Sequence, residues 1–418
     1  MDGADLLAAE RADESPLDDG ALRALVGQAL ERVPLDGERV LLIVPDSTRS
    51  GPVDRFFRIF HALCAGRVKA LDVLVALGTH PPMEEQAIRA LLGCGDEHAD
   101  VGLFNHEWDR PERFRELGRI PAAEIEKLSG GLLARELSVR VNARLFDYDR
   151  LAICGPVFPH EVAGFSGGNK YFFPGVADAE IIDLTHWLGA LITSRETIGR
   201  RCTPVRAVID RAAALIDRPK LCFCMVVEGR DLHGLYAGTP EAAHAAAVEL
   251  SAELHVIYAP RPFQSVLSVI PPMYDEIWTA AKGMYKLEPV VADGGEVILF
   301  APHVGAFSRT HGQAIERVGY HVRDYFTAQW DRFRHEPWGV LAHSTHLRGQ
   351  GAYAQGEERA RIRVVLATGI DEARCRRVGL EYRDPAEIDP RAWQDREHEG
   401  RLLVLRAGEV LYRLEAER

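Results

Sequence analysis

One segment of the 418-residue chain gathers the side chains best suited to chemistry. Residues 159–170 contain His160 and three glycines and end at Lys170, and His186 follows shortly afterwards. A lysine with a depressed pKa can act as a nucleophile or covalent tether, and an imidazole can transfer protons or bind a metal at neutral pH. The apolar run 151–154 predicts a buried strand directly before this segment, and loops that leave strand ends carry much of the chemistry of α/β proteins.

The glycines of this segment could bring backbone N–H groups close to a bound phosphate. A Walker A loop would place Ser or Thr after Gly-Lys, whereas Lys170 lies between Asn169 and Tyr171, and the Rossmann glycine pattern is missing. By themselves the glycines favour a tight turn with Lys170 in solvent. His160 and His186 are also too far apart in the sequence for a zinc pair, so no protein-only metal site is indicated.

Together these residues resemble the cofactor-attachment segment of the nickel-dependent lactate racemase family. Members of that family hold a nickel-pincer nucleotide, pyridinium-3,5-bisthiocarboxylic acid mononucleotide, covalently on a lysine. The resemblance implies that Lys170 is the tether, that His186 is the protein ligand to nickel, and that His160 is one of two acid/base histidines. It also implies a cofactor-binding role for three residues of the loop: Ser166, Gly167 and Gly168.

The apolar run 40–45 predicts another strand, and Asp46, Thr48 and Arg49 follow it. These residues could simply cap the amphipathic helix expected over 55–64. By resemblance, Asp-x-Thr-Arg is the first-strand motif of the family. Arg49 would then lie in the active site, where a guanidinium suits a carboxylate or phosphate, and Asp46 and Thr48 would line the cofactor.

A third predicted strand, 70–77, ends in Gly-Thr-His, which contains His80. Taken alone, His80 is an ordinary residue before a Pro-Pro helix entry. The motif resembles the site of the family's other acid/base histidine. His80 and His160 would then flank a substrate from opposite sides.

A later region, the predicted strand 265–270 and a helix expected over 274–290, places Trp278, Thr279 and Lys282 on one face. The simplest alternative is an amphipathic helix with a solvated lysine. In the family this face carries an aromatic residue, a glutamine and a lysine that meet the substrate. Lys282 would share the substrate carboxylate with an arginine, whereas Thr279 replaces the glutamine and favours a substrate larger or more polar than lactate.

Four of the histidines in the second half of the chain raise the question of a zinc site: His303, His311, His343 and His346. They lack a recognised zinc spacing, so they are expected to be surface or supporting residues. Residues 342–346 are expected in a loop. The sequence leaves open which of these loops touches the substrate side chain.

The predicted strands alternate with helices expected over 21–33, 203–216 and 240–254, which is typical of a parallel α/β sheet. The resemblance implies two α/β domains with parallel-type sheets and the active site in the cleft between them. The expected organisation is a flexible N-terminal arm (1–20), a cofactor-binding α/β domain (21–260), a second α/β domain (261–400) and a C-terminal segment that packs back on the first domain (401–418).

The composition of the chain limits the classes of partner and the cellular location that we expect. Fifty basic and sixty-two acidic residues give a formal net charge of −12 without a dense basic cluster, which argues against nucleic acid. Seven cysteines, an odd number without a disulfide framework, indicate reduced thiols and a cytoplasmic location; Cys222 and Cys224 are expected to pack on one face of a strand. Neither a secretory segment nor an apolar run of about 18 residues is found, so no membrane contact is expected.

The resemblance implies a racemase or epimerase that inverts C2 of a 2-hydroxy acid by reversible hydride transfer to the tethered nickel-pincer nucleotide. Expected partners are a small 2-hydroxy acid, such as a dicarboxylic or sugar acid, and the cofactor-maturation proteins of the host. Two alternatives remain open: a metal-dependent hydrolase, and a non-catalytic protein that binds the nickel nucleotide or a sugar acid. The sequence does not indicate the oligomeric state.

Overall fold

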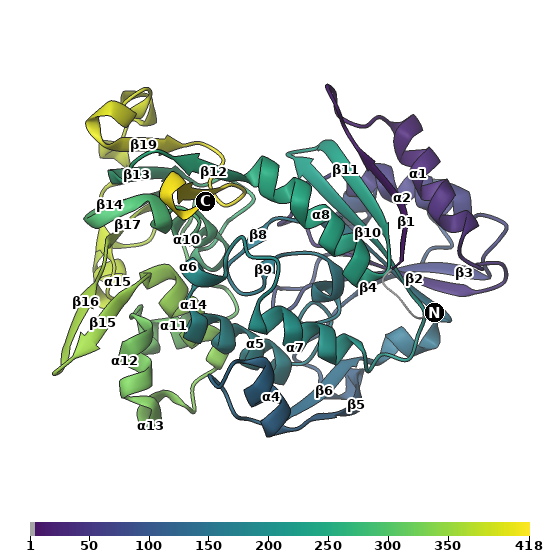
Figure 1. Cartoon of the computed structure of the whole chain (residues 1–418), viewed down its shortest axis with the longest axis horizontal. Coiled ribbons are helices and arrows are strands. Elements are labelled where there is room, and N and C mark those ends of the chain that lie inside the picture. The colour runs from purple at the N-terminus through teal and green to yellow at the C-terminus, as the bar shows by residue number, and fades with distance from the viewer. Residues whose placement is uncertain (1–4) are drawn as a thin grey trace. The chain divides into compact units, whose positions relative to one another are not determined.

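The computed structural model describes residues 5–418, and the chain folds into two units. Unit 1 comprises the described residues of Met1–Phe158 together with Ser166–Ile182 and Arg206–Glu253. Unit 2 comprises Pro159–Phe165, Asp183–Val205 and Leu254–Arg418. Figure 1 shows how the chain, coloured from purple to yellow, returns to each unit more than once.

Unit 1 is built around a seven-stranded sheet with the order β1-β11-β10-β7-β2-β3-β4. Its centre is parallel, because β10, β7, β2, β3 and β4 run in one direction, while β11 and β1 are antiparallel additions at one edge. The strands are β1 (Leu6–Arg11), β2 (Arg39–Val44), β3 (Ala70–Val75), β4 (Leu103–Asn105), β7 (Arg150–Pro156), β10 (Lys220–Glu228) and β11 (Asp231–Gly238).

Helices and a small hairpin complete unit 1. Asp18 caps the first helix, since its carboxylate accepts a hydrogen bond from Ala21 N at 2.8 Å. Apolar residues of α1 and α2 join the strands in one core, in which the rings of Phe56 and Phe223 are 5.0 Å apart. The elements are α1 (Asp19–Glu31), α2 (Val53–Cys64), α3 (Glu85–Leu92), α4 (Ala122–Leu128), β5 (Phe114–Ile120) and β6 (Leu137–Asn142), with most of α7 (Pro204–Ala213) and α8 (Pro240–His255).

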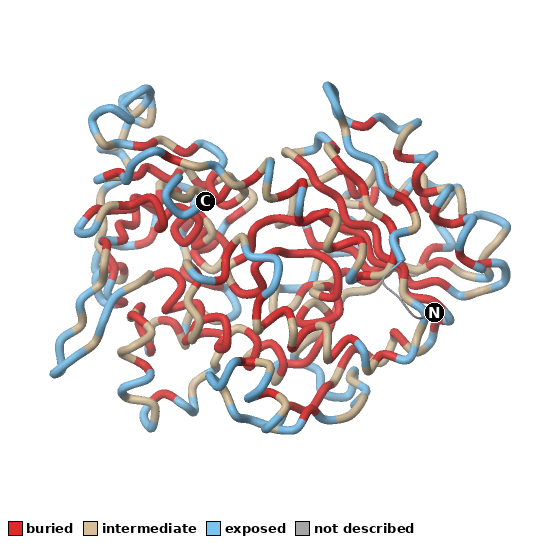
Figure 2. The backbone as a smooth tube through the Cα atoms, viewed as in Figure 1, coloured by how far each residue is buried: buried red, intermediate tan, exposed pale blue. Residues whose placement is uncertain are grey.

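Unit 2 has a five-stranded, entirely parallel sheet with the order β18-β17-β14-β13-β19. The strands are β13 (Phe263–Val269), β14 (Val291–Ala301), β17 (Arg363–Thr368), β18 (Glu381–Tyr382) and β19 (Arg401–Val404). Both faces of a parallel sheet must be covered, and Figure 2 shows the central strands as buried stretches.

Short helices surround the sheet of unit 2, and most of α5 (Ala179–Ile192) belongs to this unit. On α5, the Trp187 ring stacks on Trp330 with centroids 5.2 Å apart. The other helices are α6 (Ser194–Thr197), α9 (Ile277–Ala280), α10 (Lys282–Tyr285), α11 (Gly312–Val318), α12 (Arg323–Ala328), α13 (Trp330–Phe333), α14 (Trp338–Arg348) and α15 (Glu372–Arg377). Unit 2 also contains two hairpins, β8–β9 (Pro159–His160 and Gly164–Phe165), whose strands are buried, and β15–β16 (Gly351–Ala354 and Glu357–Ala360).

The α/β fold class and its main elements are confirmed. The apolar runs at 40–45, 70–77, 151–154 and 265–270 form β2, β3, β7 and β13, and the helices expected over 21–33, 203–216 and 240–254 are α1, α7 and α8. Cys222 and Cys224 do point the same way, with their sulfur atoms 3.5 Å apart. Within residues 5–418, no helix combines the length and apolar character that crossing a bilayer requires.

The ends of the chain differ from the expectation. Residues 1–4 of the expected arm lie outside the described residues, but Leu6–Arg11 is β1, held antiparallel to β11. At the other end, β19 extends the sheet of unit 2, and β20 (Leu411–Leu414) pairs in parallel with β12 (Val256–Ala259). β12 lies within the range 21–260 expected for the first domain, but the structure assigns it to unit 2, which resumes at Leu254.

Two local expectations were wrong. The region expected as one helix over 274–290 is divided into α9, α10 and a short turn. Within α10, Gly283 packs tightly against β13, and its carbonyl accepts a hydrogen bond from the Ser268 hydroxyl at 2.8 Å. Residues 342–346 lie within the helix α14 and are buried on all sides, which explains why they lack an amphipathic pattern.

The β8–β9 hairpin of unit 2 depends on Gly164. Its φ is +84°, and a Cβ there would lie 1.9 Å from the Arg200 carbonyl oxygen. We predict that Gly164→Ala lowers the free energy of unfolding of unit 2 by about 2–4 kcal/mol, because left-handed strain and a backbone clash add. Gly229→Ala is the matched control, since φ is +58° but no atom lies within 4 Å. Scanning calorimetry should show a much smaller shift for the control; equal shifts would refute the role of the close approach.

Candidate functional site

Unit 1 brings Asp46 and His80 together at the edge of its sheet. Because β2 and β3 are parallel neighbours with Val44 opposite Val75, the loops after them start side by side. Asp46 Oδ2 lies 2.5 Å from His80 Nδ1, and Asp46 Oδ1 accepts hydrogen bonds from the Thr48 backbone N–H at 3.1 Å and hydroxyl at 2.6 Å. The carboxylate therefore holds the Nδ1 proton of His80, which leaves Nε2 as the proton acceptor of a neutral ring.

Asp46 stays ionised in this setting. Burial alone would raise the pKa of its carboxyl, but the electrostatic interactions with His80 and Arg49 and the hydrogen bonds from His80 and Thr48 outweigh burial and hold the pKa well below its usual range. Arg49 is fixed beside the pair, since its guanidinium donates to the Thr48 carbonyl at 3.3 Å and hydroxyl at 3.2 Å. The pair thus presents an oriented imidazole beside an ionised carboxylate.

The glycine-rich loop follows β7 in the same unit. The Ser166 hydroxyl donates to the Pro156 carbonyl at 3.1 Å and accepts from Phe158 N at 2.9 Å. A Cβ on Gly167 would lie 2.7 Å from the Val157 side chain, and one on Gly168 would lie 2.9 Å from the His244 side chain. These two glycines are therefore required by packing, whatever they bind.

Polar side chains of α7 and α8 clamp this loop. The Asn169 amide donates to Asp210 at 3.0 Å and to Glu241 at 2.6 Å, and Arg206 donates to the Gly167 carbonyl at 3.1 Å. Lys170, which follows Asn169, is half-buried. No motif in the sequence indicates this clamp, because its three partners, Arg206, Asp210 and Glu241, lie on helices further along the chain.

His160 lies in the β8–β9 hairpin of unit 2, and its Nδ1 has two partners. It lies 3.1 Å from the Val162 backbone N–H, which donates to a neutral ring, and 3.4 Å from the Glu161 carboxylate, which can accept from a protonated one. The surroundings of His160 thus support both protonation states. Glu161 was part of the motif but had been given no role.

His186 is half-buried on α5, and two histidines of α14 interact with it electrostatically. Burial, followed by the neighbouring His346, His311 and His186, lowers the pKa of His343 to about 3. Burial likewise lowers the pKa of His346 to about 4. Both rings are therefore neutral at pH 7. They are supporting residues as expected, but buried rather than on the surface.

Trp278 is positioned at the start of α9. Its backbone N–H donates to the Phe307 carbonyl at 2.9 Å, and its indole lies against the imidazoles of His311 and His343, with ring centroids 4.5 and 4.3 Å apart. His343 is also within 3.2 Å of the Tyr320 hydroxyl. The indole therefore has a polar aromatic border.

The two other predicted substrate residues follow Trp278. The Thr279 hydroxyl donates to the Glu276 carbonyl one turn earlier at 3.1 Å, and Lys282 Nζ lies 4.5 Å from the centre of the Tyr274 ring. His303 lies apart from the histidine group, with Nε2 3.1 Å from the Tyr274 carbonyl oxygen. Thr279 therefore offers only acceptor capacity to a ligand, because its proton is used within the chain.

Each unit thus gathers its own share of the predicted residues. Unit 1 holds Asp46, Thr48, Arg49, His80, Ser166, Gly167, Gly168 and Lys170, and unit 2 holds His160, His186, Trp278, Thr279 and Lys282. Among residues 5–418, no group of three or more His, Cys, Asp or Glu side chains could hold a metal ion. A metal bound by His186 would therefore take its other ligands from a cofactor, and this donor set fits a metal that arrives within a larger group.

Comparison with known proteins gives one consistent family. Residues 8–199 match the model of the lactate racemase N-terminal domain. A Thermotoga maritima protein of known structure is 32% identical, with a TM-score of 0.90 over 97% of this chain and 100% of that one. The chain belongs to the lactate racemase family.

More distant relatives agree. The lactate racemases of Thermoanaerobacterium thermosaccharolyticum and Lactiplantibacillus plantarum are 24% and 25% identical over 63% and 65% of this chain, which covers 60% and 62% of their length. The apoprotein structure of the former has the same fold, with 20% identity and a TM-score of 0.72 over 96% of this chain and 94% of that one. The family model spans His80, His160, Lys170 and His186 but ends before Trp278.

Proposed function

We propose that the protein is a racemase or epimerase that inverts C2 of a 2-hydroxy acid by reversible hydride transfer, with a nickel-pincer nucleotide tethered to Lys170. The observation that carries the proposal is the Asp46–His80 pair, an ionised carboxylate that orients a proton-accepting imidazole. Family membership supports the reaction class.

Proton abstraction alone is a poor route to this inversion, because a carbanion would form beside the substrate carboxylate. The nickel-pincer nucleotide, once bound, would supply a hydride acceptor instead. Lys170 would hold the nucleotide covalently, and His186 would be the protein ligand to its nickel. Asp46, Thr48, Ser166, Gly167 and Gly168 are proposed to line it.

The two histidines would handle the hydroxyl proton. His80 would accept it at Nε2, and the Asp46 carboxylate would stabilise the resulting imidazolium through Nδ1–H. On the return step, His160 would donate a proton from its charged form, whose Nδ1–H can pair with Glu161. For the opposite enantiomer the roles reverse, so each histidine must tolerate both protonation states.

Arg49 and Lys282 are proposed to hold the substrate carboxylate, since a fixed guanidinium and an ammonium both form charge-assisted hydrogen bonds. The remaining specificity would come from Trp278 and Thr279. Thr279 is shorter than the family's glutamine and keeps its own proton occupied, so it leaves space. His311 and His343 beside Trp278 supply polar edges, which favours a dicarboxylic or sugar acid over lactate.

The first test is covalent attachment. We predict that protein from a cofactor-making host carries a large mass adduct on the Lys170 peptide and racemises a 2-hydroxy acid, and that Lys170→Arg loses both. His186→Ala should keep the adduct but lose nickel in proportion to activity, because only the metal ligand is removed. Intact mass, nickel content and chiral separation of products measure the three quantities.

Lys69→Ala, a change to an exposed lysine of unit 1, is the control and should keep adduct, nickel and rate. Activity without an adduct that is lost to a chelator and restored by a free divalent metal would instead identify a hydrolase-type metal site. An adduct with nickel but no turnover on any 2-hydroxy acid would identify a carrier.

The second test concerns proton transfer. We predict that His80→Asn and His160→Asn each lower kcat in both directions by about 10²–10⁴-fold, the range for a general acid/base group. Asp46→Asn should lower kcat by about 10²-fold with little change in KM, because it removes the charge that stabilises protonated His80 while keeping the shape.

His233→Asn is the matched control, since His233 also faces a carboxylate in unit 1, with Nε2 3.5 Å from Glu228. It should leave kcat unchanged. Near-normal turnover in either catalytic variant would show that the histidine concerned is structural.

The third test concerns the substrate. We predict that a panel of enantiopure 2-hydroxy acids gives the highest kcat/KM for one with a second polar group, and that Thr279→Gln shifts the order toward lactate. A site built around a substrate hydroxyl can reject an analogue without it by about 10⁴-fold, whereas one methylene changes kcat/KM by only about 10–200-fold.

Thr327→Gln is the matched control, because its hydroxyl also bonds to a carbonyl three residues earlier, at 3.3 Å from Asp324 O, but on an exposed helix. Thr279→Ser serves if the larger side chain impairs folding, and should widen the range of accepted substrates. Lactate as the best substrate of the unchanged protein would contradict the specificity proposal and leave the racemase assignment standing.

A further inference from the structure

Unit 2 contains a pocket of about 520 Å³ that has no part in the proposed reaction. It lies at the end of α5 and the start of α6, and its other walls come from the end of α14 and the β15–β16 hairpin. Pockets of about 300–1,000 Å³ are typical of small-molecule sites. Its size therefore suits a small organic ligand rather than a single ion.

Three buried polar atoms of the lining lack a partner among the residues that the structure describes, and one of them is Arg361 Nε. The other two are His346 Nε2, on a residue only 4% exposed, and Thr193 Oγ1. A buried polar group without a hydrogen bond costs about 1–3 kcal/mol. A ligand that bonds to both groups would recover this free energy.

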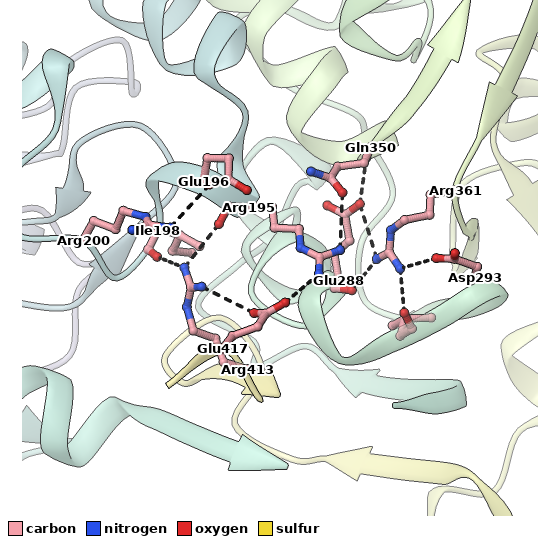
Figure 3. Close-up of polar contacts among 11 residues, drawn as sticks. Arg195, Glu196, Ile198, Arg200, Glu288, Asp293, Gln350, Arg361, Arg413 and Glu417 are labelled. Atoms are coloured by element: carbon pink, nitrogen blue, oxygen red, sulfur yellow. Dashed lines mark hydrogen bonds and ion pairs between the residues drawn. The ribbon is translucent and has the colours of Figure 1, made fainter. Parts of the chain in front are cut away.

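Arg361 and Gln350 add donors that are held in place by the chain (Figure 3). The terminal nitrogens of Arg361 donate to the carbonyls of Val291 at 2.7 Å and Glu288 at 2.6 Å, while its Nε is buried without a partner in the described chain. The Gln350 backbone N–H donates to the Glu288 carboxylate at 2.7 Å, and its side-chain oxygen accepts from Arg195 at 3.4 Å. The amide nitrogen of Gln350 keeps its own N–H groups for a ligand.

Hydrogen bonds and ion pairs connect the segments that lie behind these donors. Figure 3 shows Arg195 between Gln350 and Glu417, to which it donates at 2.6 Å. Arg413 donates to the Ile198 carbonyl at 2.6 Å, which ties the last strand to α6. Such support keeps a site pre-organised, so little ordering is needed when a ligand binds.

The charges of the lining favour an anion. It contains Arg323, Arg359 and Arg361 but only one carboxylate, Glu196, which faces Arg200 at 3.4 Å. The arginines do have acidic neighbours outside the lining, namely Asp324, Glu357, Asp293 and Glu288. The surface that a ligand would meet is nevertheless rich in donors and poor in acceptors, which suits carboxylate or phosphate oxygens.

We propose that this pocket is a second ligand site, which binds a small organic anion through its carboxylate or phosphate oxygens. Thr193 and His346 would bond to the buried end of the ligand, and Gln350, Arg359 and Arg361 would contact its charged group. The proposal does not rest on the racemase assignment, because none of these residues takes part in the proposed reaction.

The test is calorimetric titration of the full chain with citrate, 3-phosphoglycerate and inorganic phosphate. We expect one site for at least one of the two organic anions, with weaker binding of inorganic phosphate, which fills only part of the pocket. The preferred anion distinguishes a carboxylate from a phosphate site. No binding of any of the three at millimolar concentration would overturn the proposal.

Three variants locate the site, each with a matched control. Thr193→Val should weaken binding about tenfold by removing one hydroxyl, whereas Thr197→Val removes a buried, similarly unpartnered hydroxyl outside the lining. Arg359→Gln should weaken binding two- to tenfold, about the effect of one exposed charge, whereas Arg391→Gln changes an arginine that also pairs with an acid two residues earlier.

Ala352→Phe should block the pocket without removing a donor, and Ala354→Phe, on the same strand but outside the lining, should not. Equal affinities in the variants and their controls would place the bound anion elsewhere and overturn the proposal. Loss of binding in Arg49→Gln, with the pocket variants unaffected, would place it at the proposed substrate residues instead.

Discussion

The parallel pairing of β2 with β3 is the constraint on which the chemistry of unit 1 depends. Asp46 and His80 are 34 residues apart in the sequence and meet only because both strands end at the same edge of the sheet. A shift of the register by one residue would turn one side chain to the other face. The orientation of a candidate base thus follows from strand packing.

The imidazoles of this protein show how surroundings assign different tasks to one side chain. His80 has a single fixed partner, an ionised carboxylate, and is prepared to accept a proton. His160 has an N–H donor and a carboxylate within reach of one nitrogen, which suits exchange between two protonation states. His343 and His346 are buried among other histidines and stay neutral. The same imidazole side chain thus occupies three different environments in this protein.

The sequence was sufficient wherever a local pattern dictated the structure. Apolar runs such as Leu151–Cys154 can only be buried, so the strands and the loops after them were predicted correctly. The single helix expected over 274–290 was wrong, because the structure divides this region at Ala281 into α9 and α10 and ends it in a short turn. The pairing of the C-terminal strands was not predicted, because β19 and β20 have only four residues each and their partner strands are distant in the sequence.

The same distinction between local patterns and tertiary contacts applies to the candidate site. The loops that carry the motif residues do follow the predicted strands β2, β3 and β7. The hydrogen bonds that hold Asn169 were not predicted, because Asp210 and Glu241 lie 41 and 72 residues downstream and neither belongs to a motif. His343 and His346 were judged by spacing alone, whereas their burial in α14 sets their character. Local sequence therefore locates reactive groups, while tertiary packing decides their protonation.

The helix α5 links the two ligand sites proposed for unit 2. It carries His186, and Ala190 one turn later lines the anion pocket, so about 6 Å of helix separates the two positions. His346 lines the same pocket and interacts electrostatically with His186. A bound anion can change the properties of His186 only by as much as its affinity differs between two arrangements of these residues. Because Trp187, between the two positions, stacks on Trp330 in a packed core, α5 offers little freedom for such a change. The shorter route is through the imidazole of His346, whose Nε2 would acquire its first hydrogen-bond partner from the ligand.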